Sequence, residues 1–398
     1  MPVPGLPVPP TASVAVLPGA ATPPPTGTPA PVTVAPVRPA VPVAPPSATV
    51  PTTRPVPTDP TDPTAPTDPL PSDPLPSTRS SAPSPVTLPG AALPGPPAAP
   101  GDMRPITVQG DRIMRDGVPW WFLGYNSFVW SGDCGDGDEE MTAQDVDAWF
   151  AGMRHDGHGA VRLFFYDGWD IARLDAAVAS ATAHDVYLTI TLDDAIGGCG
   201  ENDKDAGWFA DPEERAGYQR HMTTLLERYR GENAIAWFEF FNEPAYEGGA
   251  LRRFFDDMGA VADRIDPDRL FSSGTVAPYW LDGEDNFRDV HESPGVDIAS
   301  MHEYDMDEVE SNHGPGVRAG AAGKPVIVGE FGIDAGPGCA GFESRAARFA
   351  DKAAAYTATD VGYVGAFGWA WQPGGSGCDL GNLDADPATQ DVLRSYAR

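Results

Sequence analysis

The sequence predicts an α/β fold, a (β/α)8 TIM barrel formed by residues 102–398, preceded by a disordered Pro/Thr/Ala-rich segment at 1–101. Apolar runs alternate with amphipathic helical patterns, which is typical of a parallel sheet covered by helices on both faces. Eight such runs occur, and eight strand–helix repeats indicate a closed barrel. The runs are 121–125, 160–166, 186–192, 234–242, 270–273, 297–303, 325–332 and 365–371.

An open, doubly wound sheet is the alternative arrangement for the same alternation of strands and helices. No GxGxxG motif follows the first predicted strand, which weighs against a dinucleotide-binding fold of that kind. The residues after 101 are enough for one large core, so a single barrel domain is expected at 102–398.

The elements between these runs also have recognisable beginnings. A hairpin is predicted at 106–108 and 112–114, because Gly110-Asp111 between them is a turn pair. Helical patterns with polar or proline residues at their starts run over 142–153 and 212–229, and a third apolar helical pattern runs over 254–265.

The N-terminal segment 1–101 consists mainly of Pro, Thr, Ala, Val and Ser and has almost no aromatic residues. Proline at this density removes amide donors and fixes φ, so neither helix nor sheet propagates. We expect an extended, semi-stiff linker; a small folded domain is the alternative.

The chain carries a net charge of −31, nearly all of it after residue 101. Such a charge repels nucleic acid and anionic membrane surfaces and favours a neutral partner, for which a polysaccharide qualifies. The acidity also has the simpler explanation of solubility. No apolar run is long enough to insert into a membrane, and a monomer is expected.

Four cysteines fall in Gly/Asp-rich segments after predicted strands. They form no CxxC pair, which argues against a zinc site. Disulfides Cys134–Cys199 and Cys339–Cys378 are expected, with unpaired thiols as the alternative. Together with the linker they favour a secreted or cell-surface protein, although no signal-peptide pattern is recognisable and a cytosolic location stays open.

Two glutamates at the ends of predicted strands are the strongest functional signal. Glu243 follows the fourth run, and Glu330 lies in the seventh. A charge there is costly unless it is paired or the strand end opens into a cleft, and catalytic residues of barrels cluster at these ends. Glycosidic-bond hydrolysis needs two carboxylates, one proton donor and one nucleophile or base. A structural ion pair is the alternative for either residue.

The order of the surrounding motifs points to a known family. Arg162 on the second strand, Asn242-Glu243-Pro244, His302-x-Tyr304, Gly329-Glu330-Phe331-Gly332 and Trp369 follow one another along the chain. Over about residues 104–398 the sequence resembles the cellulase/mannanase-like retaining glycoside hydrolases of family 5 and their barrel clan A. The resemblance implies a two-step retaining mechanism on β-1,4-linked polysaccharide.

The resemblance assigns the catalytic roles. It makes Glu243 the general acid/base and Glu330 the nucleophile. Arg162 would pair with the nucleophile and keep it ionised, Tyr304 would donate a hydrogen bond to it, and Asn242 would contact the sugar hydroxyl next to the anomeric carbon. Phe240 and Phe241 are expected to help desolvate Glu243 and keep it protonated.

The remaining site residues are expected to contact sugar, because a flat aromatic ring matches the C–H face of a pyranose. His302 would line the −1 sugar site and Trp369 would stack on that sugar. Further candidate platforms in strand-end loops are Trp371, Trp130, Trp169, Trp208 and Trp280, and Asn126 is a candidate polar contact. For Asp193-Asp194, after the third strand, substrate binding and capping of a turn are the two alternatives.

The sequence leaves the polymer open between β-mannan and β-glucan. A non-catalytic glycan-binding or wall-associated module and a transglycosylase on the same site are the alternative functions. No HExxH motif or EF-hand loop is present, and this chemistry needs neither a metal nor an organic cofactor.

Overall fold

The computed structural model describes most of the chain after residue 102, and these residues belong to one compact unit, Leu88–Arg398. The predicted linker at 1–101 and all four cysteines lie outside the described residues. No described helix has the length and apolar character needed to cross a membrane. The described ranges are 103–128, 130–131, 141–197, 203–304, 317–318, 320–335, 341–358, 362–373 and 381–397.

Eight parallel strands form the barrel, in the order β8-β7-β6-β5-β4-β11-β10-β9. A parallel bridge between Ser272, at the end of β8, and Ile298, just before β9, joins the two outer strands of that order. The predicted barrel is therefore confirmed. The strands are β4 (Phe122–Ser127), β5 (Ala160–Phe164), β6 (Tyr187–Thr191), β7 (Ile235–Glu239), β8 (Leu270–Ser272), β9 (Ala299–Glu303), β10 (Val326–Phe331) and β11 (Tyr363–Gly368).

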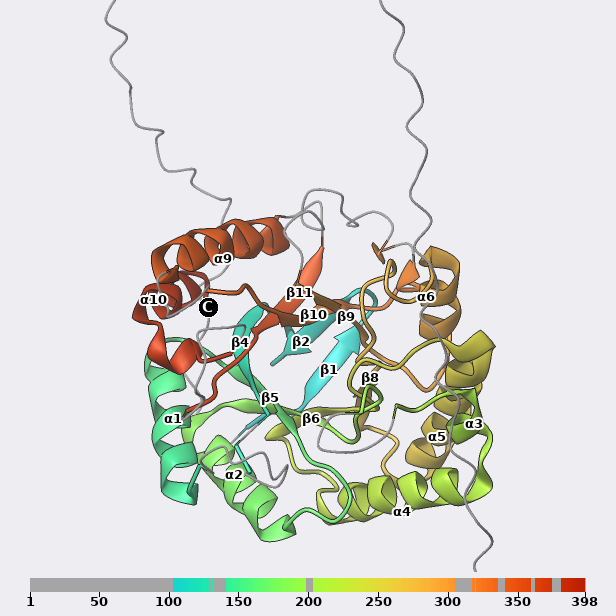
Figure 1. Ribbon diagram of the computed structural model, residues 1–398. Helices are drawn as coiled ribbons and strands as arrows, with labels where there is room; N and C mark the ends of the chain where they lie inside the picture. The colour runs from blue at the N-terminus through green and yellow to red at the C-terminus, as the bar shows by residue number, and fades with distance from the viewer. Residues whose placement is uncertain are drawn as a thin grey trace, which may run out of the picture. The chain divides into compact units, whose positions relative to one another are not determined.

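Helices form a ring around these strands (Figure 1). Helix α1 begins where the sequence predicts, because Thr142 and Asp145 each accept a hydrogen bond from the other's backbone N–H. The helices are α1 (Ala143–His155), α2 (Ile171–His184), α3 (Ala206–Ala210), α4 (Pro212–Arg228), α5 (Ala250–Ile265), α6 (Glu284–His291), α9 (Phe342–Thr357) and α10 (Pro387–Tyr396), with short 3-10 turns η2 (Glu247–Gly249) and η4 (Leu383–Ala385).

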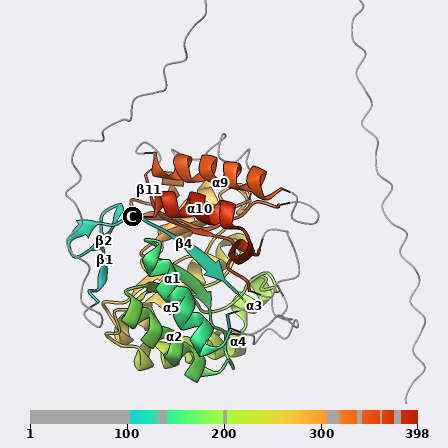
Figure 2. The same ribbon diagram turned by 90° about the vertical axis from the view of Figure 1, so that its left-hand side faces the viewer.

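The predicted hairpin is confirmed and lies at the end of the barrel from which β4 starts (Figure 2). Arg115 pairs with Asp185 at 2.6 Å, and the Tyr187 hydroxyl donates to the Arg104 carbonyl at 2.9 Å, both just before or at the start of β6. The opposite end, where the strands finish, is left for the functional site. The small sheet consists of β1 (Ile106–Gln109), β2 (Arg112–Arg115) and β3 (Val118–Pro119).

The barrel interior changes from aromatic to polar along its axis. Near the hairpin end, the ring of Phe122 lies 5.8 Å from Trp237 and 5.0 Å from Phe367, centroid to centroid, and all three side chains are buried. Gly365 lets the Phe122 ring approach β11, since a Cβ at that position would lie 2.2 Å from ring carbons. Further along the strands, the interior side chains include Thr191, Arg162 and Glu239.

Substituting Gly365 tests the packing of the aromatic rings inside the barrel. Gly365→Ala should destabilise the domain by about 1–3 kcal/mol, because the surrounding rings leave Phe122 no room to move. Gly152→Ala is the matched control: it lies on an exposed face of α1 with no atom near the added Cβ, and should stabilise by up to about 1 kcal/mol. Thermal unfolding of both variants checks this, and equal midpoints would contradict it.

Candidate active site

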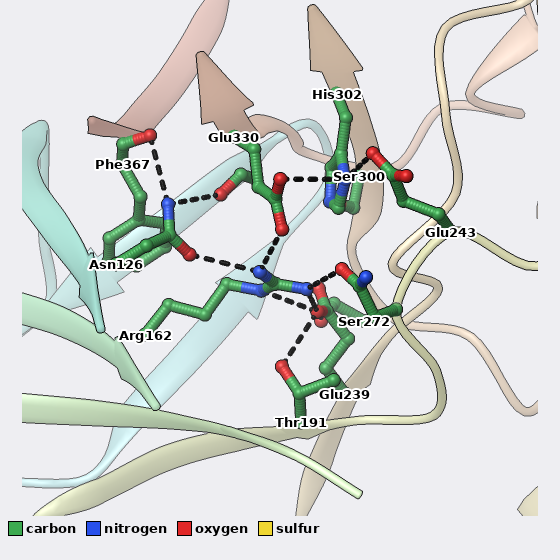
Figure 3. Close-up of polar contacts among 12 residues, drawn as sticks. Asn126, Arg162, Thr191, Glu239, Glu243, Ser272, Ser300, His302, Glu330 and Phe367 are labelled. Carbon is green, nitrogen blue, oxygen red and sulfur yellow. Dashed lines mark hydrogen bonds and ion pairs between the residues drawn. The ribbon is translucent and has the colours of Figure 1, made fainter. Parts of the chain in front are cut away.

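A buried guanidinium lies at the centre of the polar part of the barrel. Arg162, on β5, is fully buried and donates hydrogen bonds to four other side chains (Figure 3). Its Nε donates to Glu239 Oε1 at 2.6 Å, and its Nη1 donates to Glu330 Oε1 at 2.5 Å. Nη1 also donates to Asn126 Oδ1 at 2.9 Å, and Nη2 to Asn242 Oδ1 at 3.0 Å. Residues from several strands are thereby fixed around one cation.

Burial lowers the pKa of Arg162, but the two carboxylates beside it raise it by more, so the guanidinium stays charged. Glu239, the last residue of β7, faces it from below the site. Glu239 Oε1 also accepts from Thr191 Oγ1 at 3.0 Å, and Oε2 accepts from Ser272 Oγ at 2.9 Å. With both oxygens engaged and no exposed surface, Glu239 is a supporting residue and not a reacting one.

Glu330, on β10, is held by one partner at each oxygen. Oε1 accepts from Arg162, and Oε2 accepts from the hydroxyl of Tyr304, just after β9. Burial raises the pKa of Glu330 above its ordinary value, against the lowering effect of His302, Arg162 and the Tyr304 hydrogen bond. Burial also raises the pKa of Tyr304 well above its ordinary value, so its hydroxyl remains a donor. The geometry brings together the Arg–Glu and Tyr–Glu contacts expected from the sequence.

Glu243 lies beyond β7 in a backbone conformation that is rare for a residue with a side chain. Its φ is 50°, in the left-handed region, and its N–H donates to the Gly274 carbonyl at 2.9 Å. The side chain is 18% exposed, with Oε1 at 2.9 Å from Nδ1 of the buried His302. The same Nδ1 lies 3.6 Å from Glu330 Oε2, so the imidazole contacts both carboxylates.

The three side chains form one compact cluster. One oxygen from each glutamate and one His302 nitrogen all lie within 4.8 Å of one another. Among the described residues, this is also the group that could hold a metal ion.

The expected effect of Phe240 and Phe241 on Glu243 is wrong. Both rings are fully buried and pack against α5, at 4.8 Å from Phe255 and 5.2 Å from Phe254 respectively. Burial does raise the pKa of Glu243, but the hydrogen bond and charge of His302 and the charge of Arg162 outweigh it, and the net shift is downward. The adjacent imidazole of His302 therefore decides the direction of the Glu243 pKa shift.

A pocket of about 290 Å³ opens above this cluster. Of the residues expected to contact sugar, Asn242 and Trp369 line it, together with Tyr304 and both glutamates. His302, which was expected to line the −1 sugar site, is buried and does not line this pocket. Asn242 Nδ2 donates to Asp194 Oδ1 at 2.9 Å, so Asp194 supports the amide from inside the pocket wall. The lining residues are Phe128, Phe164, Tyr166, Asp194, Ile196, Asn242, Glu243, Tyr304, Glu330 and Trp369.

Several lining residues were not predicted from the sequence. Phe164 and Tyr166 follow Arg162 at alternate positions, and alternate residues of a strand share one face. This alternation with Arg162 was the sequence signal that could have predicted both residues. Phe128 and Ile196 lie in loops, where no periodicity assigns a direction.

The expectation that Asn126 contacts substrate is wrong. Asn126 is fully buried on β4, and its Nδ2 donates to the carbonyls of Gly329 and Phe367 at 3.1 and 3.2 Å. Its Oδ1 accepts from Arg162, which leaves the amide oriented by β10 and β11 and directed at the guanidinium. Asn126 positions Arg162 from beneath the pocket.

Two of the further tryptophan platforms, Trp130 and Trp371, are also wrong. Trp130 is 1% exposed, and its Nε1 donates to the Phe164 carbonyl at 2.9 Å. Trp371 is partly buried and stacks on Trp149 at 5.6 Å with an interplanar angle of 16°. Neither ring lines the pocket, because each packs into the hydrophobic core. Of these three tryptophans, Trp369 lines the pocket, with its ring nearly perpendicular to that of Phe164 and the centroids 6.0 Å apart.

Comparisons with known proteins agree with this fold. No protein-family model matches the chain. The chain is 25% identical over 308 residues to mannan endo-1,4-beta-mannosidase 8 of Oryza sativa subsp. japonica, covering 60% of this chain and 82% of that protein. It is 24% identical over 285 residues to mannan endo-1,4-beta-mannosidase A of Podospora anserina, covering 57% and 73%.

Among solved structures, an endo-1,4-beta-mannanase of Rhizomucor miehei superposes with a TM-score of 0.60 at 17% identity, covering 74% of this chain and 98% of that one. A glycoside hydrolase family 5 mannosidase of the same organism gives a TM-score of 0.59 at 14% identity, covering 75% and 98%. At these identities the superpositions establish the shared barrel. Together with the curated relatives they agree with the resemblance found in the sequence: the chain is similar to mannanase-like glycoside hydrolases of family 5 and has the barrel fold of these proteins.

Proposed function

We propose that the protein is a retaining endo-β-1,4-mannanase that works by double displacement, with Glu330 as nucleophile and Glu243 as acid/base. The separation of the two glutamates carries the proposal, since an oxygen of each lies within 4.8 Å of the other. Retaining glycosidases hold their carboxyls about 5–5.5 Å apart, whereas inverting ones leave about 6.5–9.5 Å for a water.

The surroundings of Glu330 suit a nucleophile. Arg162 and Tyr304 each hold one carboxylate oxygen, which fixes the orientation of the group and stabilises its negative charge. In the first step, an oxygen of Glu330 bonds to the anomeric carbon while the bond to the leaving sugar breaks. The product of this step is a glycosyl ester on Glu330.

Glu243 has the position for the proton transfers. It is the more exposed of the two carboxylates and lies across the cluster from Glu330. In the first step it gives its proton to the leaving oxygen. In the second it takes a proton from water, whose oxygen bonds to the anomeric carbon and releases Glu330.

The pKa shifts bear on which protonation state reacts. Attack needs an ionised Glu330 and a protonated Glu243, whereas the ligand-free site raises the pKa of Glu330 and lowers that of Glu243. In the ligand-free site the pKa of Glu330 therefore lies above that of Glu243. Because His302 contacts both groups, it is the residue whose contacts most directly set this balance.

Mannan as the polymer rests on the names of the curated relatives, which are mannan endo-1,4-beta-mannosidases. The site agrees with a neutral sugar: Trp369, Phe128 and Phe164 offer apolar surface, and Asn242 has a second amide hydrogen beyond the one given to Asp194. A polysaccharide does not cross a cell membrane unaided, which also supports the proposed secreted or cell-surface location.

Glu330→Ala should abolish turnover, because no ester intermediate forms. The measurement is reducing-end release from galactomannan, glucomannan, carboxymethylcellulose, mixed-linkage glucan and xylan, with the anomer of the first product followed by NMR. Mannan cleavage with retained β-configuration is expected. Glu227→Ala, an exposed carboxylate of α4, should retain wild-type activity. Full activity of Glu330→Ala, or an α-anomer as first product, would contradict the proposal.

Arg162→Lys should lower kcat/KM by about 100-fold or more, because a single ammonium does not reproduce the forked contacts to Glu239 and Glu330. The control is Arg345→Lys, which removes an equally buried guanidinium paired with Asp386 at 2.8 Å between α9 and α10. That control should lower the unfolding temperature and leave turnover per folded molecule unchanged. Near-wild-type kcat/KM in Arg162→Lys would refute the role of the guanidinium.

His302→Ala should shift the basic limb of the kcat/KM–pH profile to higher pH. The limb reports loss of the proton that Glu243 must donate, and the His302 contact lowers the pKa of Glu243; removing it raises that pKa. The profile is measured on mannohexaose with His155→Ala, whose side chain is 87% exposed, as control. A basic limb that stays in place or moves to lower pH counts against this assignment.

A further inference from the structure

Two neighbouring aromatic side chains are unusually exposed on the loop that follows β8. Tyr279 is 70% exposed and Trp280 is 65% exposed, with their rings edge-to-face at 5.1 Å. In the described part of the chain, the other large apolar side chains with comparable exposure are Val118 and Ile196. Exposed rings of this size form a patch of the kind that marks a binding surface.

The backbone beneath the two rings is fixed. Trp280 N–H donates to the Ala277 carbonyl at 2.9 Å, and Gly283 N–H donates to the Pro278 carbonyl at 2.8 Å. Leu281, the next residue, is 1% exposed and anchors the turn in the core. The rings are therefore presented by an ordered turn, so binding a ligand there carries little cost of ordering the loop.

This loop is joined to the catalytic residues by its backbone. The Ala277 N–H donates to the His302 carbonyl at 3.2 Å, and the Gly274 carbonyl accepts from the N–H of Glu243 at 2.9 Å. The rings thus follow a segment bonded to both the acid/base candidate and its histidine partner.

The strand order places the loop on one side of the bond that is cut. Strand β8 neighbours β7, the strand that leads into Glu243, while Glu330 lies on β10 next to β11, which leads into Trp369. The acid/base contacts the leaving oxygen, so the side of Glu243 is the side of the leaving group. Ile196, 53% exposed on the loop after β6, flanks Glu243 from the other neighbouring strand and lines the pocket.

We propose that Tyr279 and Trp280 form a stacking platform for a sugar ring on the leaving-group side of the scissile bond. The inference rests on the proposed function and extends it from the reacting sugar to the sugars of the polysaccharide beyond the scissile bond. A pyranose presents C–H groups on its faces, which match an indole and a phenol over a large apolar area. Binding on both sides of the cut favours cleavage within a polymer, and a sugar held there can also replace water as the acceptor.

The test compares two substrates that differ on the leaving-group side. Mannohexaose extends across the bond, whereas β-mannobiosyl fluoride leaves a single atom there. In Tyr279→Ala and Trp280→Ala, kcat/KM for the hexasaccharide should fall about tenfold more than for the fluoride. The share of transglycosylation products should fall with it. Val118→Ala, an equally exposed apolar residue at the hairpin end, should change neither substrate. Equal losses on both substrates would overturn the platform.

A binding measurement separates failure of the platform from failure of the proposed function. In the Glu330→Ala background, calorimetry with mannohexaose should show affinity weakened about tenfold by Trp280→Ala, whether or not the wild type turns over mannan. Unchanged affinity for mannohexaose and for cellohexaose overturns the platform. A change of oligomeric state in Trp280→Ala, measured by sedimentation, also overturns it, because the rings would then bind protein.

Discussion

The ion cluster around Arg162 is the interaction on which the rest of the site depends. The Arg162 guanidinium has no solvent contact and bridges Glu239 and Glu330. It also donates to the amide oxygens of Asn126 and Asn242, which fix its orientation. Removing one partner from such a buried cluster leaves an uncompensated charge, which costs about 3–5 kcal/mol. The cluster therefore keeps a carboxylate on β10 in a fixed place at the mouth of the barrel, where an isolated buried charge would be unstable.

Most of the fold was predictable because each helix, strand or turn is indicated by a local sequence pattern. Uniformly apolar runs, helix caps such as Thr142 with Asp145, and the Gly110-Asp111 turn each depend on neighbours in the sequence. The order Arg162, Asn242-Glu243, His302-x-Tyr304, Glu330 then located the cluster, since strand ends of a barrel converge. These predictions needed no knowledge of which side chain faces which.

The incorrect predictions concern the direction in which side chains point and the direction of the pKa shift of Glu243. Asn126 and Trp130 were correctly placed near the end of the first strand, yet each is turned into the core by hydrogen bonds to backbone carbonyls of other strands. Trp371 is drawn away by stacking on Trp149 of α1. The pKa of Glu243 is lowered by the imidazole of His302, which is adjacent to it in the fold but distant in the sequence. Periodicity along one strand carries none of this information.

Trapping the covalent intermediate tests the central claim most directly. In a 2-deoxy-2-fluoro-β-mannosyl fluoride the 2-fluorine slows both steps, because both transition states are oxocarbenium-like. The anomeric fluoride is a good leaving group and restores only the first step, so the ester accumulates. Mass spectrometry of the intact protein, followed by peptide mapping, should show one added sugar on the peptide that contains Glu330. A sugar attached to another residue, or turnover of the natural polymer with no adduct formed at all, would contradict the assignment of Glu330 as nucleophile.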